Sequence, residues 1–283
     1  MAEQQTTEPR LSVFTMLAIP FDWLGGRMLG ILEHIGSTVN LFIDALRWIL
    51  RCGTSKQYRL GRAAIISQIL RIGVRSIAII SLVSGSVGLI LALQMAPPLD
   101  QFGSREIVAR IVGVAVFREL GPLISAIVLT GFAGAAIAAE IGTMVVNEEI
   151  EALEAHALNP TRFLVVPRIL ATTASMIVLA VYADLVANGA SLFISMTTLG
   201  IPFTTYWDNM MAQVKPVDFY TGLIKSGIFG CLIGLIACHN GLKVTGGADG
   251  VGRATTNTVV QSVVSIIVAD LMFTAIFFIL GLV

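Results

Sequence analysis

The sequence predicts an all-α protein that crosses a membrane several times. Of its 283 residues, 55% are hydrophobic and 13% are charged, against a charged fraction of about 25% in average soluble domains. The mean hydropathy is +0.85. These values exclude an ordinary soluble enzyme and a disordered chain. The 18 basic and 18 acidic residues balance, so no net positive charge favours nucleic acid as a partner.

Five segments are long and apolar enough to be membrane spans, because a helix needs about 20 apolar residues to cross the hydrocarbon. Pro97 and Pro98 are expected to end the first of them. Seven basic residues and no acid lie between Ala45 and Arg75, which places this end in the cytoplasm. Five spans then leave the C-terminus outside. The spans are predicted near residues 76–97, 107–133, 167–196, 217–240 and 256–281.

The first 60 residues are predicted to form a cytoplasmic leader, and residues 61–283 the membrane domain. Within the leader, polar residues recur along one stripe of a helix from Met28 to Arg51, and apolar residues fill the rest. This pattern is typical of an amphipathic helix that lies in the membrane interface. A sixth span in this segment is the alternative.

Motifs for catalysis or for nucleotide and metal binding are absent from the sequence. There is no GxxxxGK[ST] phosphate-binding loop, and the glycine-rich segment 246–252 lacks its lysine, so we predict a flexible cytoplasmic loop there. Cys52, Cys231 and Cys238 form no disulfide framework or CxxC pair. We therefore expect no catalytic residue, no metal and no cofactor bound by this chain.

Small residues recur at helical spacing in the second and fourth spans, a pattern that allows helices to approach closely in lipid. We expect this packing to be within the chain rather than at a dimer seam. The residues are Gly131, Gly134, Ala135, Ala138, Ala139, Gly227, Gly230 and Gly234.

Five charged residues lie inside predicted spans: Arg118, Glu119, Asp184, Lys225 and Asp270. Each costs about 2.5–3.5 kcal/mol at membrane depth, so each needs a partner or water. Arg118 and Glu119 are adjacent and point about 100° apart on an α-helix. We expect that they cannot face one partner together, and that one of them meets Lys225 or Asp270. A structural ion pair and a role in gating or head-group passage both remain open.

The loop between the second and third spans is predicted to contain a short acidic helix. Asn147 is the expected N-cap, acids follow in the first turn, and Asn159-Pro160 is the expected stop. Ile150, Leu153 and Ala157 would form an apolar stripe. An ordinary connector and a docking helix for a cytoplasmic partner are both compatible with this pattern.

Several sequence blocks, in order, resemble the MlaE/YrbE permease family. They are Arg118-Glu-Leu-Gly-Pro-Leu123, Ala139-Glu-Ile-Gly-Thr-Met144, Glu148-Glu-Ile-Glu-Ala-Leu-Glu154, the segment from Asn159-Pro160 to Val165-Val-Pro-Arg168, and Gly250-Val-Gly-Arg-Ala-Thr-Thr-Asn-Thr-Val-Val260. The resemblance covers roughly residues 60–280. It implies the membrane-spanning subunit of an ABC transporter that moves phospholipids or related lipids between membranes.

The same resemblance implies partners and a location. The partners would be a second copy in a homodimer, a cytoplasmic ABC ATPase that binds ATP and Mg²⁺, a periplasmic MCE-domain lipid-binding protein, a small STAS-type cytoplasmic subunit and membrane lipids. The location would be the bacterial inner membrane, with the N-terminus cytoplasmic and the C-terminus periplasmic. The alternatives are a secondary transporter with Asp184, Asp270 or Lys225 as a proton relay, and a structural anchor for a lipid-transfer complex.

Carried over residue by residue, the resemblance implies three sites. The ATPase-coupling helix would comprise Glu148, Glu149, Ile150, Glu151, Leu153, Glu154, Ala157 and Leu158. The intramembrane charges would be Arg118, Glu119, Lys225 and Asp270. A lipid pocket would lie around Leu89, Leu93, Gln94 and Met95.

Overall fold

The computed structural model describes residues 13–54 and 62–281, and these form helices without a β-strand among them. The predicted all-α class is confirmed. The chain divides into two compact units, residues 1–43 and 44–283. Helix α1 (Val13–Thr54) contains the predicted amphipathic segment, and its apolar side chains Leu29, Leu32 and Ile35 are exposed. Its place in the membrane interface stays a prediction.

The second unit contains five helices that are long and apolar enough to cross a membrane, as predicted. Their ranges are Ala63–Gln101, Arg105–Val146, Thr161–Thr197, Pro216–Leu242 and Gly247–Ile279.

Three of these spans are single helices, α2 (Arg62–Gln101), α9 (Pro216–Leu242) and α10 (Gly247–Ile279). The third begins with a π-helical turn, η4 (Thr161–Val165), followed by α7 (Val166–Thr197). The second span is a succession of η1 (Arg105–Ile107), α3 (Val108–Ala115), the π-helical η2 (Val116–Leu120), α4 (Gly121–Leu129), the π-helical η3 (Thr130–Gly134) and α5 (Ala135–Val146).

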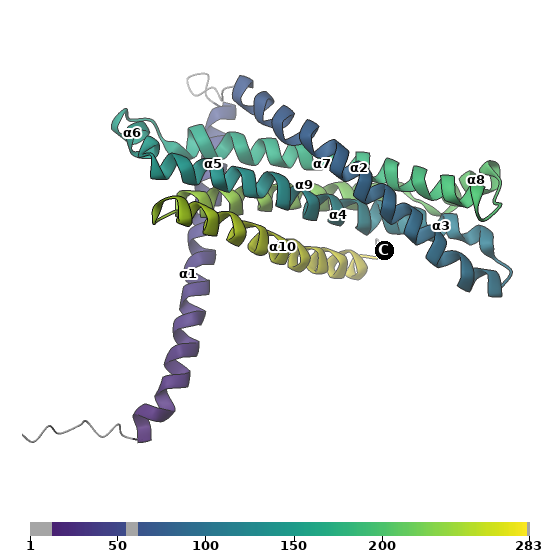
Figure 1. Ribbon diagram of the computed structural model, residues 1–283, viewed down its shortest axis with the longest axis horizontal. Helices are drawn as coiled ribbons and strands as arrows, with labels where there is room; N and C mark the ends of the chain where they lie inside the picture. Colours follow the sequence, from purple (N-terminus) through teal and green to yellow (C-terminus); the bar gives the residue numbers. More distant parts are fainter. Residues whose placement is uncertain (1–12, 55–61, 282–283) are drawn as a thin grey trace, which may run out of the picture. The chain divides into compact units, whose positions relative to one another are not determined.

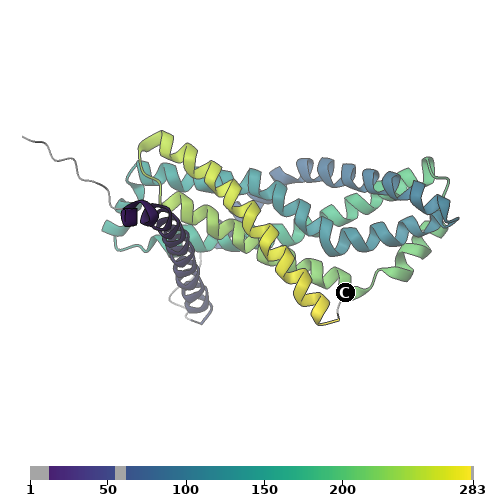
Figure 2. The ribbon, with the colours of Figure 1, turned by 90° about the horizontal axis from the view of Figure 1, so that it is seen from below.

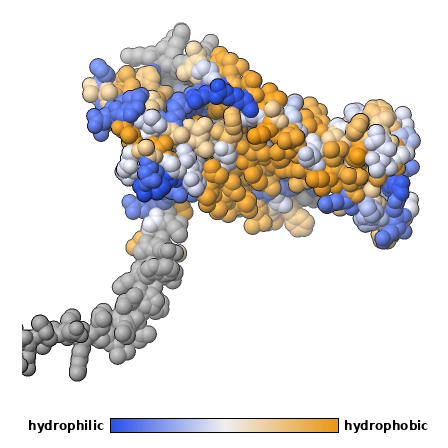
Figure 3. Space-filling model, in the orientation of Figure 1, coloured by the Kyte–Doolittle hydropathy of each residue, from blue (hydrophilic) through white to orange (hydrophobic). Residues whose placement is uncertain are grey.

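The five spans lie side by side and form one bundle (Figure 1). Helix α7 packs against α2 and α9, and α10 packs obliquely across α5 and α9 (Figure 2). Short helix α6 (Glu149–Ala155) lies at one end of the bundle, and α8 (Phe203–Gln213) lies at the other. Hydrophobic residues cover the middle of the bundle between hydrophilic ends (Figure 3), which is the pattern that lipid requires.

Several expected boundaries were wrong, among them the end of the second span, which lies at Val146 and not near residue 133. Pro97 and Pro98 do not end the first span, because α2 continues through both to Gln101. Ala92 and Ala96 beside them are buried in a cluster with residues of α3, so tertiary packing holds this last part of the helix. The glycine-rich segment 246–252 is not a loop either, since α10 begins at Gly247.

The helix between the second and third spans is present but shorter than predicted. It begins after Glu148, which has a left-handed φ of 59°, and ends at Ala155. Asn147 is therefore not the N-cap. Asn159 does not stop this helix, which has already ended at Ala155. Its Oδ1 instead accepts a hydrogen bond from the Arg162 N–H, at the start of the next helical segment.

Helix α8 was not predicted. Its buried face carries Tyr206 and Met210, which pack with Ala109 and Ile201. The Tyr206 hydroxyl donates a hydrogen bond to Ser191 Oγ at 2.9 Å. Burial raises the pKa of the Tyr206 phenol above its ordinary value, and this hydrogen bond acts in the opposite direction.

Candidate functional site: buried charges and cavities of the bundle

Lys225 is the centre of a polar cluster that joins three spans. Its side chain is fully buried on α9, and its Nζ donates hydrogen bonds to Glu119 Oε2 at 2.5 Å and to Thr274 Oγ1 at 2.9 Å. Asp270 Oδ1 lies 2.9 Å from Nζ as an ion pair without hydrogen-bond geometry. The Thr274 hydroxyl also donates to Glu119 Oε1 at 3.1 Å. The expected pairing of Lys225 is thus confirmed with both carboxylates.

Arg118 reaches a different residue of the same helix. Its Nε and Nη2 donate to Asp218 Oδ1 at 3.0 and 2.5 Å, and Asp218 is buried near the start of α9. Arg118 and Glu119 thus have separate partners, as expected, yet Asp218 and Lys225 are both on α9. The two residues belong to π-helical η2, whose wider turn departs from α-helical directions.

Asp218 was missed by sequence reasoning, although a signal exists. It lies seven residues before Lys225, a spacing that puts both side chains on one face of α9. Gly222 lies between them on this face. A Cβ built on Gly222 would be 2.2 Å from the Phe117 carbonyl oxygen, so only glycine lets the backbone of η2 approach α9 this closely.

Asp184 is the exception among the charges inside spans. It is 4% exposed on α7, and no described side chain forms an ion pair with it. Its Oδ1 lacks a hydrogen-bond partner and occupies the space where a Cβ on Gly121 would lie. Among the described side chains Asp184 thus has no charged partner, and its solvation by water stays a prediction.

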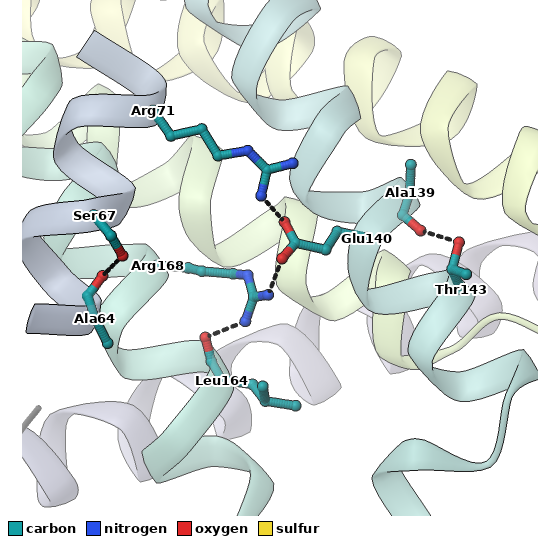
Figure 4. A network of polar contacts seen from close by, with 8 residues as sticks. All are labelled: Ala64, Ser67, Arg71, Ala139, Glu140, Thr143, Leu164 and Arg168. Carbon is teal, nitrogen blue, oxygen red and sulfur yellow. Dashed lines mark hydrogen bonds and ion pairs between the residues drawn. The ribbon is translucent and has the colours of Figure 1, made fainter. Parts of the chain in front are cut away.

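A second ion-pair cluster lies near the α6 end of the bundle and was not predicted (Figure 4). Glu140 of α5 accepts from Arg71 of α2 at 2.8 Å and from Arg168 of α7 at 2.9 Å. Arg168 is buried and also donates to the Leu164 carbonyl oxygen. One carboxylate thus ties the first, second and third spans together.

A cavity of about 550 Å³, wide open on one side, lies on the second span toward the α8 end. Its polar lining is Arg110, Arg118 and Gln213, and its apolar lining includes Ile111 and Val114. Arg110 also donates to Asn209 Oδ1 at 2.7 Å. The volume is within the range of about 300–1,000 Å³ that is usual for small-molecule sites. The arrangement suits a ligand with an apolar part and an anionic group.

The other residues carried over from the resemblance lie on accessible surfaces. Leu93 and Gln94 of α2 are exposed, whereas Met95 packs against the buried cluster around Val112. Binding of lipid at Leu89, Leu93, Gln94 and Met95 stays a prediction. On α6 the acids Glu149, Glu151 and Glu154 are exposed, and Ile150 and Leu153 are half-buried. Ala157 and Leu158 are exposed beyond the end of α6.

The small residues of the fourth span pack within the chain, as expected. Gly230 and Gly234 lie against α7, close to Thr172, while nothing lies within 4 Å of a Cβ on Gly131. Among the described residues, no His, Cys, Asp and Glu side chains form a group that could hold a metal ion.

The family described as Permease MlaE matches residues 65–276, which include three spans in full and nearly all of the first and the last. The chain belongs to the MlaE permease family. Similar proteins include probable ABC transporter permease proteins of Rickettsia felis, 35% identical over 76% of this chain and 83% of the relative, and of Rickettsia bellii, 32% identical over 90% and 96%. The chloroplastic protein TRIGALACTOSYLDIACYLGLYCEROL 1 of Arabidopsis thaliana is 33% identical over 75% of this chain and 61% of the relative.

Membership of the MlaE permease family makes this chain a multi-pass ABC transporter permease. The matched residues contain both ion-pair clusters, α6 and the cavity at Arg110 and Arg118. Helix α1 lies outside the match.

Proposed function

We propose that this MlaE permease moves phospholipids or related lipids between membranes, driven by a separate cytoplasmic ATPase. The observation that carries the lipid assignment is the cavity beside Arg110 and Arg118, which combines cationic and apolar lining. A phospholipid has the matching chemistry, an anionic phosphate beside apolar chains. The name of the Arabidopsis relative contains that of a galactolipid, which supports a lipid substrate with a diacylglycerol part but says nothing of a phosphate.

The ATPase would act through α6. Two residues separate α5 from α6, and five separate α6 from η4, so a force on α6 is transmitted to the second and third spans. Binding of nucleotide by the ATPase would favour one of two conformations of these spans. The half-buried Ile150 and Leu153 and the exposed acids of α6 would enter a groove with a basic rim.

We place α6 and the N-terminus in the cytoplasm and the C-terminus in the periplasm of a bacterial inner-membrane protein. The basic residues before the first span support this orientation. A second copy of the chain, a periplasmic MCE-domain protein and a small STAS-type subunit complete the proposed complex. ATP and Mg²⁺ would be bound by the ATPase and not by this chain, which lacks a phosphate-binding loop.

The decisive experiment introduces Leu153→Asp and measures both copurification of the ATPase and ATP-dependent lipid transfer between vesicles. Burial of a leucine contributes about 1.5–3 kcal/mol, so we expect the ATPase to be lost while the permease still inserts. Charge reversal at Glu151 and Glu154 should weaken the complex less, and more visibly at low salt.

Ala248→Asp is the matched control, because Ala248 is exposed in the first turn of α10, outside α6. It should leave ATPase binding unchanged. Normal ATPase recovery and normal lipid transfer with Leu153→Asp would mean that α6 is only a connector, and the proposed coupling would be refuted.

A further inference from the structure

A second, smaller cavity lies between α2 and the η3–α5 part of the second span, toward the α6 end. Its polar lining is Gln68, Arg71, Arg75 and Glu140, and its apolar lining includes Ile72 and Phe132. The cavity volume is about 50 Å³. At roughly 10–15 Å³ per water, it has room for a few waters or for one tetrahedral anion.

Positive charge exceeds negative charge around this cavity. Arg71 and Arg168 share the single carboxylate of Glu140 (Figure 4). Arg75 lies one turn beyond Arg71 on α2, is exposed, and forms no ion pair with any described side chain. Arg71 and Arg75 in the cavity lining and the neighbouring Arg168 thus bring three positive charges, against the single negative charge of Glu140. Arginine binds phosphate through paired N–H donors, so the surplus charge fits a phosphate group.

The surroundings favour a lipid phosphate over a free one. Leu70 and Val74 flank the arginines on α2 and are 57% and 59% exposed, and Phe132 on the other wall is 37% exposed. Arg75 is also the last charge before the apolar stretch of α2 that begins at Ser76. The site thus lies where the head groups of one leaflet meet its acyl chains.

We propose that this cavity binds the phosphate of an anionic phospholipid from the leaflet on the α6 side. Arg75 and Arg71 would hold the phosphate, and an acyl chain would lie along the exposed apolar face of α2. The site is separate from the cavity at Arg110 and Arg118 toward the α8 end, and it does not depend on what the protein transports.

The test measures lipid retention by the purified full-length protein with native mass spectrometry. Phosphatidylglycerol and phosphatidylcholine with identical acyl chains are titrated separately. The parent protein should retain phosphatidylglycerol preferentially. Arg75→Gln should weaken the binding of phosphatidylglycerol about 10- to 100-fold, as expected for loss of a hydrogen-bonded charge. The affinity of Arg75→Lys should lie between those of the parent and of Arg75→Gln.

Arg253→Gln is the matched control, because Arg253 is an exposed arginine that pairs with Asp249 away from the cavity. It should bind phosphatidylglycerol as the parent does, and millimolar inorganic phosphate should not displace the lipid.

Equal retention of the two lipids, unchanged binding by Arg75→Gln, or an equal loss with Arg253→Gln would overturn the proposal. Displacement by inorganic phosphate would make this a site for free anions. Disulfide cross-linking between two copies of a Gln68→Cys variant, absent from the parent, would make the cavity part of a chain–chain interface. Either result would also overturn it.

Discussion

Replacing Lys225 with methionine should destabilise the protein strongly, because it removes a buried charge and nearly conserves volume. The ammonium group bonds Glu119 and Thr274 and pairs with Asp270, and the lysine side chain has no solvent exposure. Its loss leaves two carboxylates close together without a cation. Removing one partner of a buried pair costs about 3–5 kcal/mol.

We expect a cost near the lower end of that range, because the Glu119 and Asp270 side chains are 30% and 17% exposed and water can partly solvate the unpaired carboxylates. Converted at roughly 2–4 °C per kcal/mol, the full range corresponds to a fall in Tm of about 6–20 °C. The assay is thermal unfolding in detergent, followed by size-exclusion chromatography. Lys243→Met, at an exposed position beyond α9, should shift Tm little, because surface charges contribute about 0–1 kcal/mol.

Double-mutant cycles of Lys225→Met with Glu119→Gln and with Asp270→Asn measure how strongly each carboxylate is coupled to Lys225. Glu119 accepts a hydrogen bond from Nζ and Asp270 does not, so the coupling to Glu119 should be larger by about 1.5 kcal/mol, the low end for a hydrogen bond to a charged group. If Lys225→Met unfolds at the parent temperature, or neither double mutant improves on it, the cluster is not the structural tie described above.

Two further predictions follow from packing and from charge. Gly222→Ala should lower stability by about 1–3 kcal/mol, because the new Cβ would lie 2.2 Å from the Phe117 carbonyl oxygen. Gly131→Ala is the control in the same thermal assay, because nothing lies within 4 Å of a Cβ at this position. Equal shifts in Tm for the two variants would contradict the close approach of η2 and α9. A reporter fused after Val283 should be active outside the cytoplasm, and a reporter inserted near Ala155 should be active inside it. If both reporters were active on the same side of the membrane, five spans with this orientation would be refuted.

The spans could be predicted from the sequence because hydropathy and length decide them, and lipid leaves few alternatives. Their ends could not, because packing decides them. Pro97 and Pro98 stay helical beside the buried Ala96, and the glycine-rich segment joins α10. Helix α8 was missed because eleven residues are too few for a span, although Phe203, Tyr206 and Met210 recur at helical spacing.

The Lys225 cluster could be predicted from the sequence, whereas the Glu140 cluster could not. Lys225 and Glu119 stood out because charges are rare within apolar segments. Arg71 and Glu140 lie near predicted span ends, where charges are common, so nothing in the sequence distinguished their pairing. The π-helical turn at Arg118 also escaped prediction, because this span is apolar on most sides and an extra residue therefore breaks no hydrophobic stripe.

The position of the Glu140 cluster bears on how α6 would act. Glu140 lies on the helix that precedes α6, and Arg168 lies on the helix that follows it. Their 2.9 Å contact therefore closes the loop that carries α6. A hinge at this point would have to break a contact of a buried arginine, which is costly. A force on α6 should consequently move α5 and α7 as one body, and Arg71 would pass that movement to α2. The conformational change is then expected farther along the bundle, at the π-helical η2 and the Lys225 cluster, and not beside α6.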